Sequence, residues 1–124
     1  MARRRVVVTG LGVISPVGNS VSVAWENLLA GRTGIADITK FDASQYSCRF
    51  AGEVKGFEVE RYMPAKEARH MDTFIHFGMA AGIQAFADSG IEVTEANAER
   101  IGVIVGSGIG GLPMIEHTHA ELVA

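Results

Sequence analysis

Two runs of β-branched residues, each followed directly by glycines, constrain the fold of this chain more than any other feature. They lie within residues 3–12, RRRVVVTGLG, and residues 100–111, RIGVIVGSGIGG. Runs unbroken by polar residues are typical of parallel strands that are buried on both faces of a sheet. Because α/β proteins place their sites at the carboxyl ends of parallel strands, the two glycine turns are the first candidates for function.

A long apolar segment between these runs supplies the connection that parallel strands need. From Met71 to Ala87, apolar and small residues occupy almost every position, which indicates a helix covered on all sides. Pro64 suits the first turn of this helix, and Gly90 suits the left-handed position after its end. We therefore predict an α/β fold in which parallel strands at 3–12 and 100–106 are connected by a buried crossover helix from Lys66 to Ser89.

Two shorter elements are predicted before that helix. Asn19 or Ser20 offers an N-cap to a helix over Val21–Ala30, which Gly31 closes. Residues Phe50–Val54 form a short strand. Because the chain contains no repeat, low-complexity tract or linker, we expect residues 1–124 to be one incomplete segment of a single domain.

Composition excludes several functional classes. Acidic residues outnumber basic ones, 14 to 11, so no basic face for nucleic acid is expected. No apolar stretch is long enough to span a membrane. Cys48 is the only cysteine, which excludes an intrachain disulfide and fits the cytoplasm. The apolar content of 48% and an end at Ala124, inside a predicted helix, predict a piece of a larger enzyme whose apolar surface is covered by further chain or a second copy.

The second glycine turn fits a known nucleotide-binding pattern. Gly106, Gly108 and Gly111 match G-x-G-x-x-G between a predicted strand and a helix with Pro113 near its start. The acidic residue that completes this pattern, about twenty residues further on, would fall beyond Ala124. The alternative is that these glycines only let the ends of the strands turn tightly beneath a packed neighbour.

The order and spacing of several motifs resemble the N-terminal part of β-ketoacyl-[acyl-carrier-protein] synthases, above all the type II enzymes that elongate fatty acids in bacteria. The motifs are RRVVVTGLGVISPVGN, W-x-x-L-L-x-G, FAGEVK, K-x-x-R-x-M-D-x-F, N-x-x-R-I-G and GSGIGG. The resemblance implies a thiolase-like fold and a decarboxylative Claisen condensation, in which a cysteine thiolate carries the acyl group and two histidines assist. In that family these three residues lie later in the chain, so we expect no catalytic residue, cofactor or metal site in this segment.

The resemblance also assigns a role to the bulky side chain inside the second glycine turn. Ile109 matches the family position that borders the acyl pocket and moves aside for longer chains. Gly108 and Gly110 beside it give that side chain a mobile backbone. The alternative is that Ile109 simply packs in the core.

A basic cluster at the start of the predicted long helix matches the family's docking patch for the acidic acyl carrier protein. Lys66, Arg69 and His70 are spaced to share one face of a helix near its positive end. His70 stands where the family leads us to expect a lysine. The alternative for this cluster is an ordinary solvated face.

The other candidate residues carry no predicted chemistry. Cys48 lies outside any strand-to-helix turn and is predicted to be an incidental thiol. His117 and His119 point to different faces of a helix and are poor joint metal ligands. We expect His76, on the apolar helix, to be a hydrogen-bonded core histidine.

Three functions therefore compete at this point. The leading one is a segment of a fatty-acid condensing enzyme that acts as a homodimer on acyl carrier protein and small acyl and malonyl thioesters, without nucleic acid or membrane. The second is a non-catalytic chain-length factor of the same fold. The third is a Rossmann-type nucleotide-binding segment, which rests on the glycine pattern alone.

Overall fold

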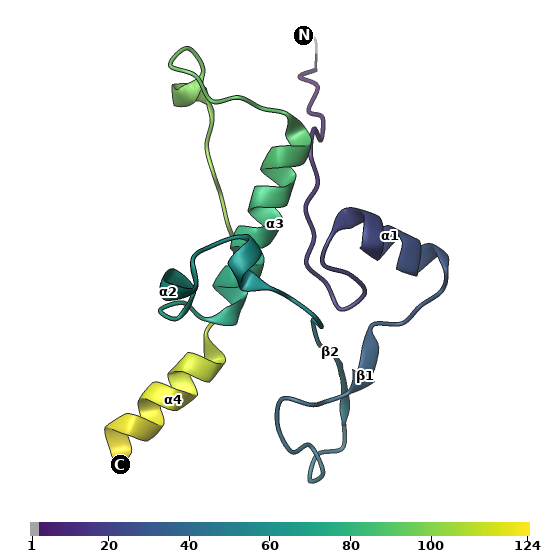
Figure 1. The fold of residues 1–124 in the computed structure, drawn as a ribbon, viewed down its shortest axis with the longest axis vertical. Coiled ribbons are helices and arrows are strands. Elements are labelled where there is room, and N and C mark those ends of the chain that lie inside the picture. Colours follow the sequence, from purple (N-terminus) through teal and green to yellow (C-terminus); the bar gives the residue numbers. More distant parts are fainter. Residues whose placement is uncertain (1–2) are drawn as a thin grey trace.

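The chain is organised around one long helix, against which several loops lie (Figure 1). The structure, a computed structural model, describes residues 3–124. Its helices are α1 Val21–Leu29, α2 Ala65–Ala68, α3 Thr73–Ser89 and α4 Leu112–Val123, and its strands are β1 Ile35–Asp37 and β2 Phe50–Gly52. Short 3-10 turns, η1 and η2, lie at Val59–Arg61 and Ala98–Arg100.

The first helix confirms the prediction from capping residues. Ser20 adopts an extended backbone conformation, and its hydroxyl accepts a hydrogen bond from the amide of Val23. This bond satisfies one of the amides that a helix start leaves unpaired. Gly31 follows the helix with a φ of 65°, the left-handed conformation that glycine adopts without steric cost.

Strands β1 and β2 pair antiparallel, with Ala36 opposite Ala51. The predicted strand over Phe50–Val54 is thus confirmed, although it ends at Gly52. Beyond the strands, the Glu53 carboxylate accepts hydrogen bonds from the Thr39 hydroxyl at 2.6 Å and from the Thr39 amide at 3.1 Å. These bonds stabilise the charged form and lower the pKa of Glu53.

The predicted parallel strands at 3–12 and 100–106 are not confirmed. Between residues 3 and 124 the only strand ladder joins β1 to β2, with one isolated bridge between Ser15 and Gly18. Val6 and Ile104, central in the two runs, are 93% and 98% exposed. A β-branched run indicates that a segment suits a buried strand, but it does not supply the neighbouring backbone that a ladder requires.

The predicted single helix from Lys66 to Ser89 is wrong, because the structure divides it in two. Helix α2 ends at Ala68, and α3 begins at Thr73 after an N-cap residue, Asp72. Asp72 has an extended backbone, with φ −76° and ψ 157°, which interrupts the helical path. The Asp72 side chain accepts a hydrogen bond from a backbone amide at the start of α3, as short polar side chains commonly do at helix starts.

Helix α3 is also less buried than its composition predicts. Ala80 is fully buried, but Phe86 on the same helix is 49% exposed. The described segments that contact α3 are mainly loops, and they cover only part of its circumference (Figure 1). The C-terminal end of the helix agrees with the sequence, since Gly90 has the predicted left-handed φ, 64°.

The first glycine turn packs directly on α3. A Cβ atom at Gly12 would overlap the carbonyl oxygen of Ala81, and one at Gly10 would overlap that of Ala85. The amide of Leu11 between them donates to the Asp88 carboxylate at 2.9 Å. These glycines therefore allow the backbone to approach the helix closely.

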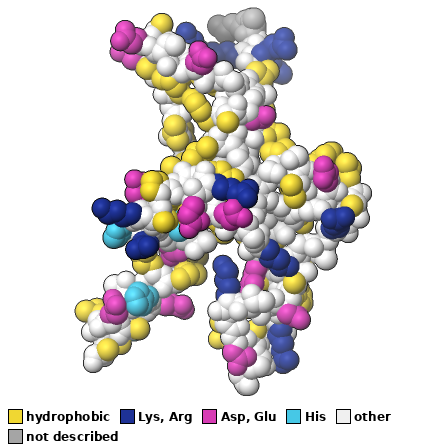
Figure 2. Space-filling model, viewed as in Figure 1, with side chains coloured by type: hydrophobic (Ala, Val, Ile, Leu, Met, Phe, Trp, Pro, Cys, Tyr) yellow, Lys and Arg dark blue, Asp and Glu magenta, His cyan; other side chains and the backbone are white. Residues whose placement is uncertain are grey.

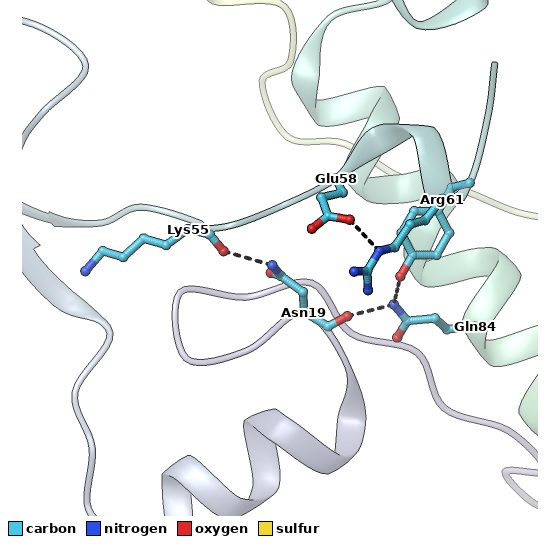
Figure 3. Close-up of polar contacts among 6 residues, drawn as sticks. Asn19, Lys55, Glu58, Arg61 and Gln84 are labelled. Atoms are coloured by element: carbon cyan, nitrogen blue, oxygen red, sulfur yellow. Dashed lines mark hydrogen bonds and ion pairs between the residues drawn. The ribbon is translucent and has the colours of Figure 1, made fainter. Parts of the chain in front are cut away.

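A polar node built around Gln84 connects α3 to two distant segments (Figure 3). Its side-chain amide donates to the carbonyl of Asn19 at 2.9 Å and to the hydroxyl of Tyr62 at 2.8 Å. Its carbonyl accepts from the amide of Val13 at 3.3 Å, and Asn19 in turn donates to the carbonyl of Lys55. One side chain thus fixes the loop before α1 and the η1 turn against α3.

Candidate functional site

The second glycine turn forms an open loop that leads into α4. Ile109 is the only bulky side chain between Gly106 and Gly111, and it is 81% exposed. Gly111 ends the loop with a φ of 76°, and α4 begins directly after it with Pro113 in its first turn. The structure thus confirms the predicted glycine loop followed by a helix, although no strand ladder precedes it.

The two ends of this loop have different surroundings. A Cβ atom at Gly106 or Gly108 would meet nothing within 4 Å. At Gly110, in contrast, a Cβ atom would lie 2.6 Å from the ring of Phe74, in the first turn of α3. Ile109 therefore lies between a loosely surrounded segment and a tightly packed one.

Asp72 connects the starts of α3 and α4. Its Oδ1 accepts a hydrogen bond from the amide of Thr73 at 2.6 Å, and its Oδ2 accepts from the amide of Met114 at 3.3 Å. Asp72 is only 9% exposed. Sequence reasoning did not single out Asp72, although an aspartate directly before an apolar helical run is a recognisable N-cap signal.

An apolar groove of about 730 Å³ runs between α3 and residues 103–107. Phe74, Met79, Ile83 and Phe86 line it from α3, and Val103 and Val105 line it from the extended segment. Its walls contain almost no hydrogen-bonding side chains, so the groove suits hydrocarbon or another apolar element of protein. Figure 2 shows hydrophobic side chains gathered along this part of the molecule.

The geometry does not favour the nucleotide-binding alternative. In that motif the phosphates lie on the free amides at the start of the following helix. Here the amide of Met114, in the first turn of α4, already donates to the Asp72 carboxylate. A carboxylate at this position repels a phosphate group and occupies one of its donors.

The predicted basic cluster lies on the surface around α2. Lys66 is inside α2, Arg69 is its C-cap, and His70 follows in the turn, so the three do not share one long helix as predicted. All three are exposed, and Figure 2 shows basic side chains and a histidine in this region. No ion pair within the described part of the chain involves them.

The remaining candidates lie apart from the loop. Cys48 is exposed, and its thiol donates a hydrogen bond to the carbonyl of Phe50 at 3.5 Å. His76 has the predicted hydrogen bond, between its Nε2 and the carbonyl of Ala68 at 2.9 Å. His117 and His119 lie on α4, where His117 contacts Glu121 at 3.3 Å.

Two further features are absent from residues 3–124. No group of three or more histidine, cysteine, aspartate or glutamate side chains is arranged to hold a metal ion. No helix in the same range has the length and apolar content to cross a membrane.

Comparison with known proteins decides the family. Residues 3–123 match the N-terminal domain of beta-ketoacyl synthases. The chain belongs to this family. The glycine loop, the α2 segment and the groove along α3 all lie inside the matched region, so they are features of a ketosynthase domain.

Two relatives of this ketosynthase segment carry the same name. The proteins called 3-oxoacyl-[acyl-carrier-protein] synthase 2 from Vibrio cholerae and Synechocystis are 60% and 49% identical to it over 123 residues. The match covers 99% of this chain but only 30% of either relative. The chain thus spans less than a third of the length of these relatives.

A solved structure supports the fold. The segment resembles a chain titled the ishigamide ketosynthase/chain length factor, with a TM-score of 0.63 and 38% identity over 73% of this chain and 23% of that chain. The fold is therefore that of a ketosynthase, even though residues 3–12 and 100–106 form no ladder within residues 3–124 and α3 is partly exposed.

Proposed function

We propose that the complete protein containing this segment is a 3-oxoacyl-[acyl-carrier-protein] synthase of fatty-acid elongation. The observation that carries the proposal is the 60% identity, over almost the whole segment, to a protein of that name. In this reaction an enzyme-bound acyl thioester acylates the carbon of malonyl carrier that loses carbon dioxide. The products are a 3-oxoacyl carrier two carbons longer, carbon dioxide and the free enzyme thiol.

Within this function the glycine loop selects the length of the acyl chain. Ile109 projects from a loop with open space around Gly106 and Gly108. A bulky side chain on such a backbone can swing aside for a long chain or stay in place for a short one. The apolar character of the groove beside Gly106 and Ser107 fits the chemistry of a hydrocarbon substrate.

The exposed cluster of Lys66, Arg69 and His70 receives the acidic acyl carrier protein. No acidic partner within the described residues neutralises Lys66 or Arg69, so both are available for a partner of opposite charge. Such exposed charges steer the encounter of two proteins more than they strengthen the final complex.

The segment is one part of this assembly. Large apolar side chains stay exposed on α3 and on residues 103–105, and Met79 and Val103 are 48% and 87% exposed. A surface of this kind is covered by further polypeptide of the enzyme and by the second copy of a cytoplasmic homodimer. Light scattering of the isolated segment should therefore reveal no stable monomer.

The direct test is a reconstituted condensation with the complete protein. Acyl carrier and malonyl carrier are supplied, and mass spectrometry follows the carrier and the enzyme. We expect a 3-oxoacyl carrier extended by two carbons and no acyl adduct on Cys48. Absence of any product would refute the proposal and favour the non-catalytic chain-length factor, while a thioester on Cys48 would place the nucleophile inside this segment.

A second test addresses the gate. Ile109→Phe in the complete enzyme enlarges the side chain between the two glycines. We expect the activity with long acyl carriers to fall at least tenfold while condensation of short chains stays within about twofold, since extra volume excludes the longer substrate. An unchanged chain-length profile would assign Ile109 to plain packing.

A further inference from the structure

We propose that Asp72 is a positioning residue for the loop that carries Ile109, and that it thereby influences chain-length selection. This inference rests on the proposed function of Ile109 as the acyl gate. Asp72 is not among the residues that line the groove. It acts through the anchored end of the loop, at the start of α4.

The carboxylate accepts hydrogen bonds from amides at the starts of two helices. One oxygen accepts from Thr73, the first residue of α3, and the other accepts from Met114, in the first turn of α4. The amides at helix starts lack partners inside their helices, and a negative charge there is also attracted by the positive end of the helix dipole. Because Asp72 is only 9% exposed, water cannot readily replace either bond.

The same turn of α3 holds the loop by a second contact. Phe74, two residues after Asp72, packs on Gly110 so closely that a Cβ there would meet its ring at 2.6 Å. At the next residue, Gly111, a Cβ atom would lie 3.6 Å from Oδ2 of Asp72. The start of α3 thus fixes residues 110–114, while residues 106–108 have open space. Ile109 lies at the boundary, so its freedom depends on how firmly the anchored side is held.

Weakening Asp72 should loosen the gate. The two amides bond to different oxygens of Asp72, and in asparagine one of these oxygens is replaced by an NH2 group, which cannot accept a hydrogen bond. The shorter bond, to Thr73, is the one expected to persist, so the start of α4 loses its partner. With residues 110–114 less firmly held, Ile109 moves aside more readily and long acyl chains gain relative to short ones.

The experiment measures chain-length selectivity in the complete enzyme. For Asp72→Asn we expect the ratio of kcat/KM for long over short acyl carriers to rise about fivefold, the change that one lost helix cap produces. Hydrogen exchange of the amides of Gly111, Leu112 and Met114 should accelerate by a similar factor. The matched control is Ser20→Ala, which removes the cap of α1. This control should lower stability and leave the ratio unchanged.

Each outcome separates the two hypotheses. An unchanged ratio in Asp72→Asn, together with a shifted profile in Ile109→Phe, overturns the role of Asp72 and leaves the gate intact. Unchanged profiles in both variants overturn the gate and this inference with it. An equal rise in Ser20→Ala reduces Asp72 to a general stabilising residue. If Asp72→Asn does not fold, Asp72→Ser, which keeps a hydroxyl cap on α3 as Ser20 does on α1, provides the same comparison.

Discussion

The Gln84 node gives the sharpest test of how this segment holds its shape. Replacing Gln84 with leucine preserves most of the side-chain volume but removes three hydrogen bonds, to Val13, Asn19 and Tyr62. All three are partly buried, and each contributes about 0.5–1.5 kcal/mol net. We therefore expect Gln84→Leu to lower the free energy of local opening by about 3 kcal/mol.

Tyr62→Phe is the matched control, because it deletes one bond of the node and leaves the other two. Its expected cost is about 1 kcal/mol. The two variants are distinguished by their effect on the amide of Val13, which donates to the Gln84 carbonyl. This amide should lose its hydrogen bond only when Gln84 is replaced.

Native-state hydrogen exchange of the complete protein measures both effects, since it reports the opening free energy of individual amides. Exchange at Val13 should accelerate by roughly 100-fold or more in Gln84→Leu and stay nearly unchanged in Tyr62→Phe. Equal exchange at Val13 in the two variants would refute the view that Gln84 holds the loop before α1 on α3.

Three further predictions concern charge, packing and pH. Lys66→Glu with Arg69→Glu should raise the KM for acyl carrier about tenfold and leave a small thioester substrate unaffected; equal losses on both substrates would indicate a damaged fold. Gly12→Ala should destabilise the complete protein by about 3 kcal/mol in thermal unfolding, because its Cβ overlaps the backbone of α3; an unchanged melting temperature would contradict this packing. The pKa of Glu53 is lower in the folded state than in the unfolded state. Its contribution to the stability of the fold is therefore fully present above the unfolded-state pKa, and it is lost as the pH falls through the folded-state pKa. An acid titration should show this loss in the wild type and not in Glu53→Gln.

Part of the candidate site could be predicted from the sequence. The loop around Ile109 and the helix after it follow from glycines and Pro113, whose conformational preferences are local. The exposure of Lys66 and Arg69 follows from their charge. The dual role of Asp72 could not be predicted, because it depends on Met114, 42 residues away in the chain.

The sequence by itself determined where α1 begins and where α3 ends, and which family the chain resembles. Ser20 and Gly90 act within a few residues of their own position, so their effects on α1 and α3 need no knowledge of the rest of the chain. Tertiary structure alone decided that residues 3–12 and 100–106 form no strand ladder within residues 3–124, and that the Asp72 carboxylate also caps the start of α4. The physical reason is that a ladder, a shared cap or a buried helix face requires a second segment, and the chain's own periodicity does not say which segment that is.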